Sequence, residues 1–284
     1  LRSDVRALGE LLGQSLVRQE GQSLLDLVEK VRAAVRSGSG EAELKDVNVD
    51  QAVQLVRAFS TYFHLANVAE QVHRSRVLEN ERAASGSWIA QAVNKIEAAR
   101  KSGHEISDEE LKHWLSDFSV RPVFTAHPTE ASRRSVLSKL AQISDLLEAP
   151  SSRVRDARLS EEIDLLWQTD ELRQGRPDPL DEAVNSIYYL DELLLETVPE
   201  VLAEFVNEIK KLGITLSLTA RPLRFGTWIG GDRDGNPNIT PAITKSAIVL
   251  QTGHFIRAML IHLDELRQAL SVSSRISGVS RELL

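Results

Sequence analysis

Apolar residues recur at every third or fourth position through the first third of the chain, which is the spacing of helices with one buried face. The first such series starts near Ser3, a residue type that caps helices, and a second opens at Asp50. Further series begin near Ser87 and at Ser107. Ser107 and Glu110 also have the spacing of a capping box, so we predict that a helix begins there.

The spacing changes at residues 120–126, where β-branched and aromatic residues form a short run. Pro128 disfavours the helical conformation at the residue before it, so we predict a strand that ends at His127. Thr129 can cap a helix whose apolar positions continue to Pro150. The pattern therefore predicts a strand, a sharp turn and a helix.

A long helical section is predicted over about residues 153–212, interrupted at residues 176–179 and bent at Pro199. Strand-like alternation returns at residues 214–218 and 223–229. A second strand, loop and helix unit follows, because a capping threonine and a proline stand together at residues 240–241.

Two strand–loop–helix units joined by a helical insertion are typical of the opening of a (β/α) barrel. We therefore expect a mainly α fold with a few short parallel strands, forming the N-terminal part of a helix-rich, incomplete (β/α)8 barrel. The expected domains are an N-terminal helical region, residues 1–117, and the first strands and helices of the barrel, residues 118–284, with the insertion at about 153–212. Loops that follow barrel strands build active sites.

Composition narrows the class of protein. Apolar residues make up 42% of the 284 residues, enough for a sizeable core, and no run approaches the roughly 18 apolar residues of a membrane helix. No secretory signal and no cysteine are present, so we expect a cytoplasmic protein without disulfides or thiolate metal sites. The net charge of −7 argues against nucleic acid as a partner. An anionic substrate would need a local basic pocket.

The densest polar stretch is VFTAHPTEASRR, residues 123–134. His127 at the predicted strand end could transfer a proton, donate to a phosphate or act as a nucleophile, while a purely structural role is the alternative. Arg133 and Arg134 lie about one turn into the following helix, and guanidinium groups bind phosphate or carboxylate. Their alternative role is in ion pairs. The other six histidines, His64 among them, have no comparable neighbours and are interpreted as structural.

A second dense stretch is WIGGDRDGNP, residues 228–237. Its alternating acidic and amide residues resemble a calcium loop, but an EF-hand needs glycine and glutamate where Pro237 and Ile243 stand. The glycines instead allow close backbone approach, and Trp228 either walls a substrate pocket or fills the core. The candidate loop residues are Gly230, Gly231, Asp232, Arg233, Asp234 and Asn236.

At these two motifs the chain resembles phosphoenolpyruvate carboxylase of the bacterial and plant type. Residues 123–134 are similar to the histidine signature of that family, and residues 228–237 to its GGDRDGNP motif. Shorter stretches also look familial, at residues 58–71 and in WQTDELR, residues 167–173. The resemblance covers essentially the whole chain.

The resemblance implies the conversion of phosphoenolpyruvate and bicarbonate to oxaloacetate and phosphate with Mg²⁺ or Mn²⁺, through carboxyphosphate and an enolate. His127 matches the histidine that takes the carboxyphosphate proton. Trp228 matches a residue of the apolar pocket near the methylene carbon, where exclusion of water protects the enolate. Arg134, and less directly Arg133, would contact phosphate or bicarbonate. The family further implies a homotetramer under allosteric control, away from membranes.

Members of this family are about three times longer, so we expect that the C-terminal half of the barrel is absent here. The metal-binding carboxylates belong to that missing portion, and we expect no metal site in this fragment and no activity from it alone. Gln174 stands where some plant-type enzymes carry an activator-site arginine, which leaves that regulation open.

Two other functions remain open at this point. The T-x-H order of residues 125–127 also occurs in phosphohistidine carriers related to phosphoenolpyruvate-using dikinases, although the glycine pair that precedes it there is missing. The non-enzyme alternative is a helical scaffold or a regulatory paralogue without catalysis.

Overall fold

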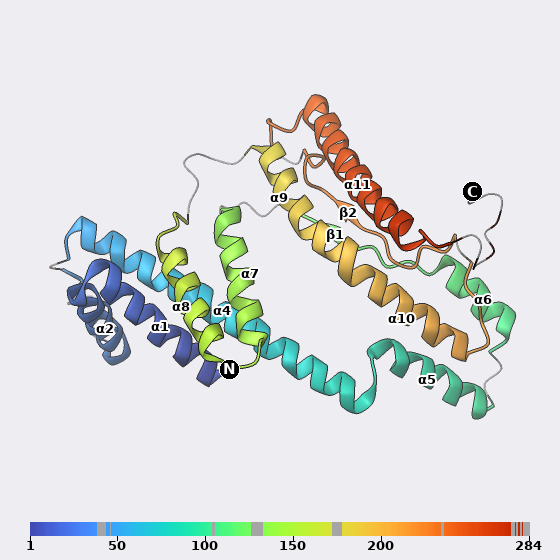
Figure 1. Cartoon of the computed structure of the whole chain (residues 1–284), viewed down its shortest axis with the longest axis horizontal. Coiled ribbons are helices and arrows are strands. Elements are labelled where there is room, and N and C mark those ends of the chain that lie inside the picture. The colour runs from blue at the N-terminus through green and yellow to red at the C-terminus, as the bar shows by residue number, and fades with distance from the viewer. Residues whose placement is uncertain are drawn as a thin grey trace. The chain divides into compact units, whose positions relative to one another are not determined.

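A computed structural model describes all residues except 39–43, 46, 104–105, 126–132, 172–177, 218, 234–235, 274–275, 277, 279 and 281–284, and the side chains of 188–189 and 191–192. Helices make up most of it (Figure 1). The elements are α1 (Arg2–Glu20), α2 (Gln22–Ser37), α4 (Val49–Ser85), α5 (Trp88–Lys101), α6 (Asp108–Asp117), β1 (Val123–Phe124), α7 (Arg134–Glu148), α8 (Arg153–Trp167), α9 (Pro179–Glu192), η1 (Leu193–Thr197), α10 (Val198–Lys211), β2 (Gly226–Thr227) and α11 (Pro241–Ala269).

The chain divides into two compact units, each built from two separate stretches of sequence. Unit 1 comprises Leu1–Ala92 and Ala131–Gly175, and unit 2 comprises Val93–Glu130 and Arg176–Leu284. The division falls inside α5 and again between β1 and α7. The expected boundary between residues 117 and 118 concerns the domains of the whole protein and stays a prediction.

Unit 1 is a bundle in which α1, α2, α4, α7 and α8 close around one apolar core. Leu8, Ile143 and Ile163 have no exposed surface at all, and each belongs to a series with helical spacing. Burying such a side chain contributes about 1.5 to 3 kcal/mol. Every helix of the bundle contributes to this core, although some large apolar side chains of unit 1, such as Val56, Phe63 and Trp88, remain exposed.

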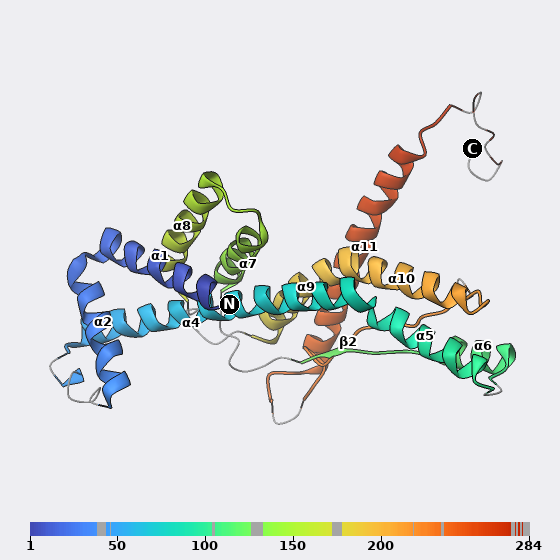
Figure 2. The same ribbon diagram turned by 90° about the horizontal axis from the view of Figure 1, so that it is seen from below.

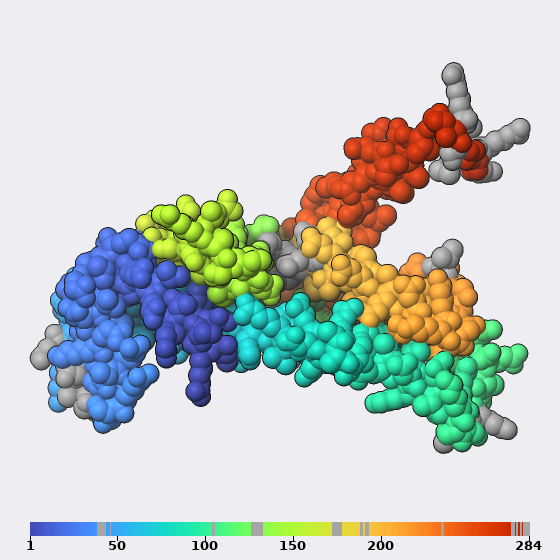
Figure 3. Space-filling view, turned by 60° about the horizontal axis from the view of Figure 1, so that its bottom comes forward, coloured from blue at the N-terminus to red at the C-terminus, as the bar shows by residue number. Residues whose placement is uncertain are grey.

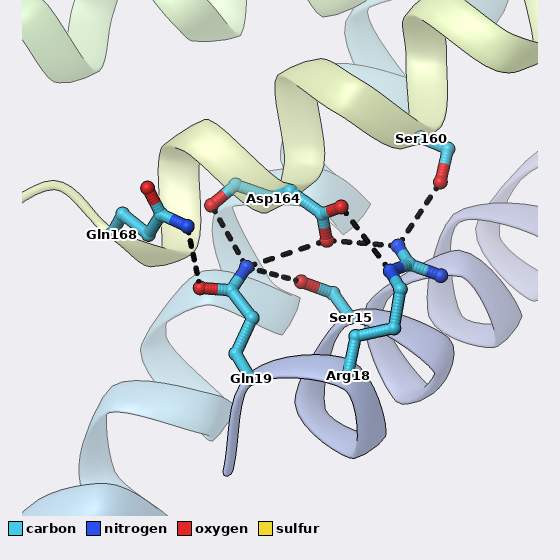
Figure 4. Close-up of polar contacts among 6 residues, drawn as sticks. All are labelled: Ser15, Arg18, Gln19, Ser160, Asp164 and Gln168. Atoms are coloured by element: carbon cyan, nitrogen blue, oxygen red, sulfur yellow. Dashed lines mark hydrogen bonds and ion pairs between the residues drawn. The ribbon is translucent and has the colours of Figure 1, made fainter.

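Polar contacts fasten α1 to α8 at the edge of this core (Figure 4). Arg18 donates to Asp164 at 2.8 and 3.2 Å and to the Ser160 hydroxyl at 3.1 Å. Gln19 adds a bond to the Asp164 backbone carbonyl at 3.1 Å. Partial burial opposes ionisation of Asp164, but the hydrogen bonds and the charge of Arg18 outweigh it and lower the pKa of the carboxyl.

Unit 2 has a smaller core, formed where the end of α5, helix α6 and the end of α10 meet. Phe118 stacks on Phe205 with ring centroids 5.7 Å apart. A single π-helical turn, η1, joins α9 to α10, with Pro199 in the first turn of α10. The predicted interruption of the long helical section is confirmed, since α8 ends at Trp167 and α9 begins at Pro179, and the bend at Pro199 stays a prediction.

The helix starts test the capping predictions directly. Ser107 accepts from the Glu110 N–H and Thr240 from the Ile243 N–H, as expected. The prediction at Ser3 is wrong, because that residue lies inside the first turn of α1. The sequence predicts that α4 starts at Asp50, but its N-cap is Asn48, which forms a capping box with Gln51.

The predicted strands are much shorter than their sequence runs. β1 ends at Phe124, three residues before His127, and residues 214–217 form no strand. β1 and β2 pair in parallel, and an isolated bridge between Val120 and Leu223 extends the ladder by one step. The mainly helical class with short parallel strands is confirmed, and the incomplete barrel remains a proposal.

Candidate functional site

The two motifs begin side by side at one end of the strand pair in unit 2 (Figure 2). Val123 pairs with Gly226 and Phe124 with Thr227. The Trp228 N–H then donates to the Phe124 carbonyl at 2.8 Å. Parallel strands end at the same edge of a sheet, so both motif loops leave from this edge. The start of the first motif and Trp228 of the second therefore lie at the same edge.

A tight turn follows β2 and fixes the start of the GGDRDGNP loop. The Trp228 carbonyl accepts from the N–H groups of Gly231 at 2.9 Å and Asp232 at 2.8 Å. Gly230 is buried with φ of 75°, and a Cβ there would lie 2.6 Å from the Cβ of Ala247 in α11. Glycine is thus required at residue 230 both for the backbone angle and for the contact with the helix.

Trp228 projects from this turn with 55% of its side chain exposed. The core-filling alternative for Trp228 is therefore wrong in this structure. An exposed indole beside the strand edge is available to cover a ligand, and aromatic side chains bring large apolar area to such a role.

The other described residues of the loop lie at the surface. Gly231, Asp232, Arg233 and Asn236 are exposed, and the Asn236 side-chain oxygen accepts from the Asn238 N–H at 3.0 Å. That bond is of the side-chain-to-backbone kind expected for this loop. Asp234 lies outside the described residues, so its predicted role is untested.

His127 also lies outside the described residues, and its role stays a prediction. Arg133 and Arg134 belong to unit 1, where they form the N-cap and the first residue of α7. The first turn of α7 contains no acidic residue. Two guanidinium groups thus stand at the positive end of a helix dipole, an arrangement that favours an anion.

The start of α7 is held by residues 170–171. The Arg133 N–H donates to the Glu171 carbonyl at 3.3 Å, and its guanidinium lies 3.5 Å from the Asp170 carboxylate. The ion-pair alternative therefore applies to Arg133. Arg134 is exposed at the surface of the helix start, so it is the better candidate for contacting an anion.

Glu171 connects this segment to α4. Its carboxylate accepts from the Ser60 hydroxyl at 2.8 and 2.9 Å and lies 2.8 Å from the His64 Nε2. Burial raises the pKa of Glu171, but the bonds from His64 and Ser60 and the nearby imidazole prevail, and the net pKa is lowered. An ionised carboxylate only accepts, so the proton of this bond belongs to the His64 Nε2.

His64 therefore has a polar partner that its local sequence does not show, and its interpretation as a structural residue stays a prediction. A signal was present in the sequence, since Ser60 and His64 stand four residues apart on one helix face and Glu171 lies in the family-like stretch WQTDELR. Their pairing with Glu171 spans 107 residues and could not be read from local spacing.

A cavity of 520 Å³ in unit 1 adjoins this cluster. Apolar side chains of the first turns of α4 line one side, and Trp167, Asp170 and Glu171 line another. The Arg57 guanidinium lies 4.5 Å from the centre of the Trp167 ring. The two carboxylates make this cavity unsuitable for a free anion, so it does not compete with the motif edge as a phosphate site.

Among the residues that the structure describes, no three His, Asp or Glu side chains are grouped so that they could hold a metal ion. No described helix is long and apolar enough to cross a membrane.

Comparison with known proteins agrees with the resemblance of the motifs. Curated proteins that match this chain are named phosphoenolpyruvate carboxylase. The family model described as phosphoenolpyruvate carboxylase matches residues 1–284. The chain belongs to the phosphoenolpyruvate carboxylase family.

Three relatives illustrate the match. The phosphoenolpyruvate carboxylase of Acinetobacter baumannii is 36% identical over 96% of this chain and 33% of its own length. That of Pseudomonas aeruginosa has the same identity and the same coverage of both chains. The Alcanivorax borkumensis enzyme is 34% identical over all of this chain and 34% of its own length. The chain thus spans about a third of the length of these curated relatives.

Proposed function

We propose that this chain forms the N-terminal part of a phosphoenolpyruvate carboxylase, which makes oxaloacetate and phosphate from phosphoenolpyruvate and bicarbonate. The observation that carries the proposal is the family match over residues 1–284. The strand edge where both family motifs begin agrees with it. Bicarbonate oxygen attacks the phosphoryl group to give carboxyphosphate and an enolate. Carboxyphosphate then yields carbon dioxide and phosphate, and the enolate carbon bonds to the carbon dioxide.

The residue roles follow from the motifs. We assign His127 as the group that takes the proton of carboxyphosphate, because imidazole exchanges protons near neutral pH. Trp228, exposed beside the end of β1, would cover the enolate and exclude water that would protonate it to pyruvate. Arg134 would contact phosphate or bicarbonate from the start of α7, with Arg133 held beside Asp170.

The remaining features of the family are also proposals for this chain. The described residues do not fit a Mg²⁺ or Mn²⁺ site. We therefore propose that the metal ligands lie in the two thirds of the relatives' sequence that this chain does not match. A two-stranded parallel sheet is too small to be stable alone, which supports completion into a barrel by further strands. A cytoplasmic homotetramer under allosteric control completes the proposal.

The test joins this chain to the last two thirds of the P. aeruginosa relative as one polypeptide and measures oxaloacetate formation from phosphoenolpyruvate and Mg²⁺. We expect bicarbonate-dependent oxaloacetate from the joined protein and none from the 284-residue chain alone. His127→Asn in the joined protein should abolish turnover while its circular dichroism spectrum stays unchanged.

Other outcomes separate the alternatives. Acid-labile phosphate on His127 without oxaloacetate would favour the phosphohistidine carrier. A folded joined protein with neither product would favour a scaffold or a regulatory paralogue.

A further inference from the structure

Helix α11 packs on unit 2 through its less apolar side. It contacts α9, yet its one buried residue in the described structure is Ala247. Ile243 and Leu250 are partly covered on this side, together with smaller or polar residues such as His254 and Ala258. This packing leaves most of the large apolar side chains of the helix exposed.

Most of the large apolar side chains of α11 face the other way. At about 100° per residue, eight of them and Leu270, the residue that follows the helix, fall within an arc of roughly 140°. Thr252 and Arg267 also fall within this arc, whereas Arg257, Asp264 and Gln268 lie outside it. Each of the nine is between 45% and 61% exposed. They are Ile248, Val249, Phe255, Ile256, Met259, Leu260, Leu263, Leu266 and Leu270, and we call this set the α11 stripe.

The second half of α11 extends beyond its contact with α9 (Figure 3). From residue 259 to residue 269 every residue of the helix is exposed. An apolar stripe of this length on one helix is larger than the scattered apolar residues of an ordinary surface and marks an interaction site.

The width of the stripe identifies the kind of partner. Pairing with one other helix uses a narrow seam of two positions in seven, whereas a stripe of at least 100° is the mark of a helix that packs on a larger apolar body. A second copy of α11 would cover only the middle of the stripe. The partner must therefore present several elements at once.

The share of the relatives' sequence that this chain matches indicates what the partner of the α11 stripe is. Curated relatives carry about two thirds of their sequence outside the part that matches this chain. We propose that the α11 stripe is the docking surface for that remaining two thirds of a phosphoenolpyruvate carboxylase. The inference rests on family membership and not on the proposed catalytic roles.

The experiment co-expresses this chain, affinity-tagged, with the untagged last two thirds of the P. aeruginosa relative, and measures their co-purification and mass by size exclusion with light scattering. We expect a complex that contains the two chains in a one-to-one ratio. Met259→Glu and Leu266→Glu, both on the stripe, should weaken binding at least tenfold.

Ile261→Glu is the matched control, since Ile261 is 60% exposed but lies roughly 160° around the helix from Met259. It should bind like the unchanged chain. All three substitutions are at exposed sites, so circular dichroism of the free chains should be the same.

Three results would overturn the proposal: no retention of the remainder by the unchanged chain, equal weakening by Ile261→Glu, or a dimer of this chain that forms through the stripe instead. Oxaloacetate formation by the complex is recorded separately. A complex without activity would leave the docking surface in place and count against the proposed function.

Discussion

Units 1 and 2 differ in the size of the core that their own helices close. The buried cluster of unit 1 contains sixteen residues from five helices, whereas that of unit 2 contains five, so unit 1 has the larger core. Both units expose large apolar side chains, but unit 2 gathers them in the α11 stripe, and it also exposes Trp228 beside the strand edge where both motif loops begin. Unit 1 therefore depends more on its own core, and unit 2 carries the surfaces that we propose other parts of a carboxylase complete.

Two tryptophans give the strongest test of this difference. Trp167 in unit 1 is 2% exposed, stacks with Arg57 and donates from Nε1 to Glu20 at 3.1 Å. We expect Trp167→Ala to lower the free energy of unfolding by about 3 to 5 kcal/mol, because it leaves a cavity and removes the bond to Glu20. Urea unfolding followed by circular dichroism measures the loss.

Trp228→Ala is the counterpart in unit 2. Because that side chain is 55% exposed, the free energy of unfolding should change by less than about 0.5 kcal/mol. In the joined carboxylase the same variant should instead raise the ratio of pyruvate to oxaloacetate. Equal destabilisation by the two variants would remove the contrast between the units.

Two glycines of unit 2 test how the motif turn is held against α11. Gly230→Ala and Gly213→Ala both place alanine at a positive φ, 75° and 77° respectively, but only at residue 230 would the new Cβ meet another side chain. We expect Gly230→Ala to cost about 1 to 3 kcal/mol more than Gly213→Ala in thermal or urea unfolding. Equal losses would show that α11 yields to the extra methyl group.

The bond network of Figure 4 tests whether polar contacts stabilise unit 1 measurably. Arg18 and Asp164 are partly exposed, so their coupling should be about 0.5 to 1 kcal/mol. A double-mutant cycle of Arg18→Ala and Asp164→Ala, read from urea unfolding, gives this coupling energy. A coupling of zero would assign the junction of α1 and α8 to apolar packing alone.

Two glutamates predict opposite pH dependences. The pKa of Glu171 in unit 1 is lowered, so its carboxylate stabilises the fold above an ordinary value of about 4.3, and this contribution disappears as the pH falls through the folded pKa. Burial, with the charge of Asp178, raises the pKa of Glu182 in unit 2. Its contribution therefore turns unfavourable as the pH rises from about 4.3 through the folded pKa.

Glu171→Gln should thus lower the midpoint of urea unfolding at pH 7, with the difference from the unchanged chain shrinking toward pH 3. Glu182→Gln should raise the midpoint at pH 7 and also converge at low pH. The same sign for both variants at neutral pH would contradict the assigned environments.

Features set by neighbouring residues were predictable from sequence. The caps at Ser107 and Thr240 depend on bonds that span three residues, so spacing alone identified them. The Glu171 bond to His64 and the contact of Gly230 with Ala247 depend on tertiary packing, which no local pattern contains. The exposure of Trp228 was undecided for the same reason. The predicted strand lengths were wrong because a run of β-branched residues indicates only β propensity. Hydrogen-bonded pairing with a neighbouring strand decides where a strand exists.

Hydrogen exchange of the 284-residue chain, alone and bound to the last two thirds of the P. aeruginosa relative, tests the contrast between the units most directly. We predict slow exchange in α7 and α8 in both states, and fast exchange in residues 259–269 of α11 that becomes slow in the complex. Residues 259–269 protected as well as α8 in the free chain, or unprotected in the complex, would contradict this account.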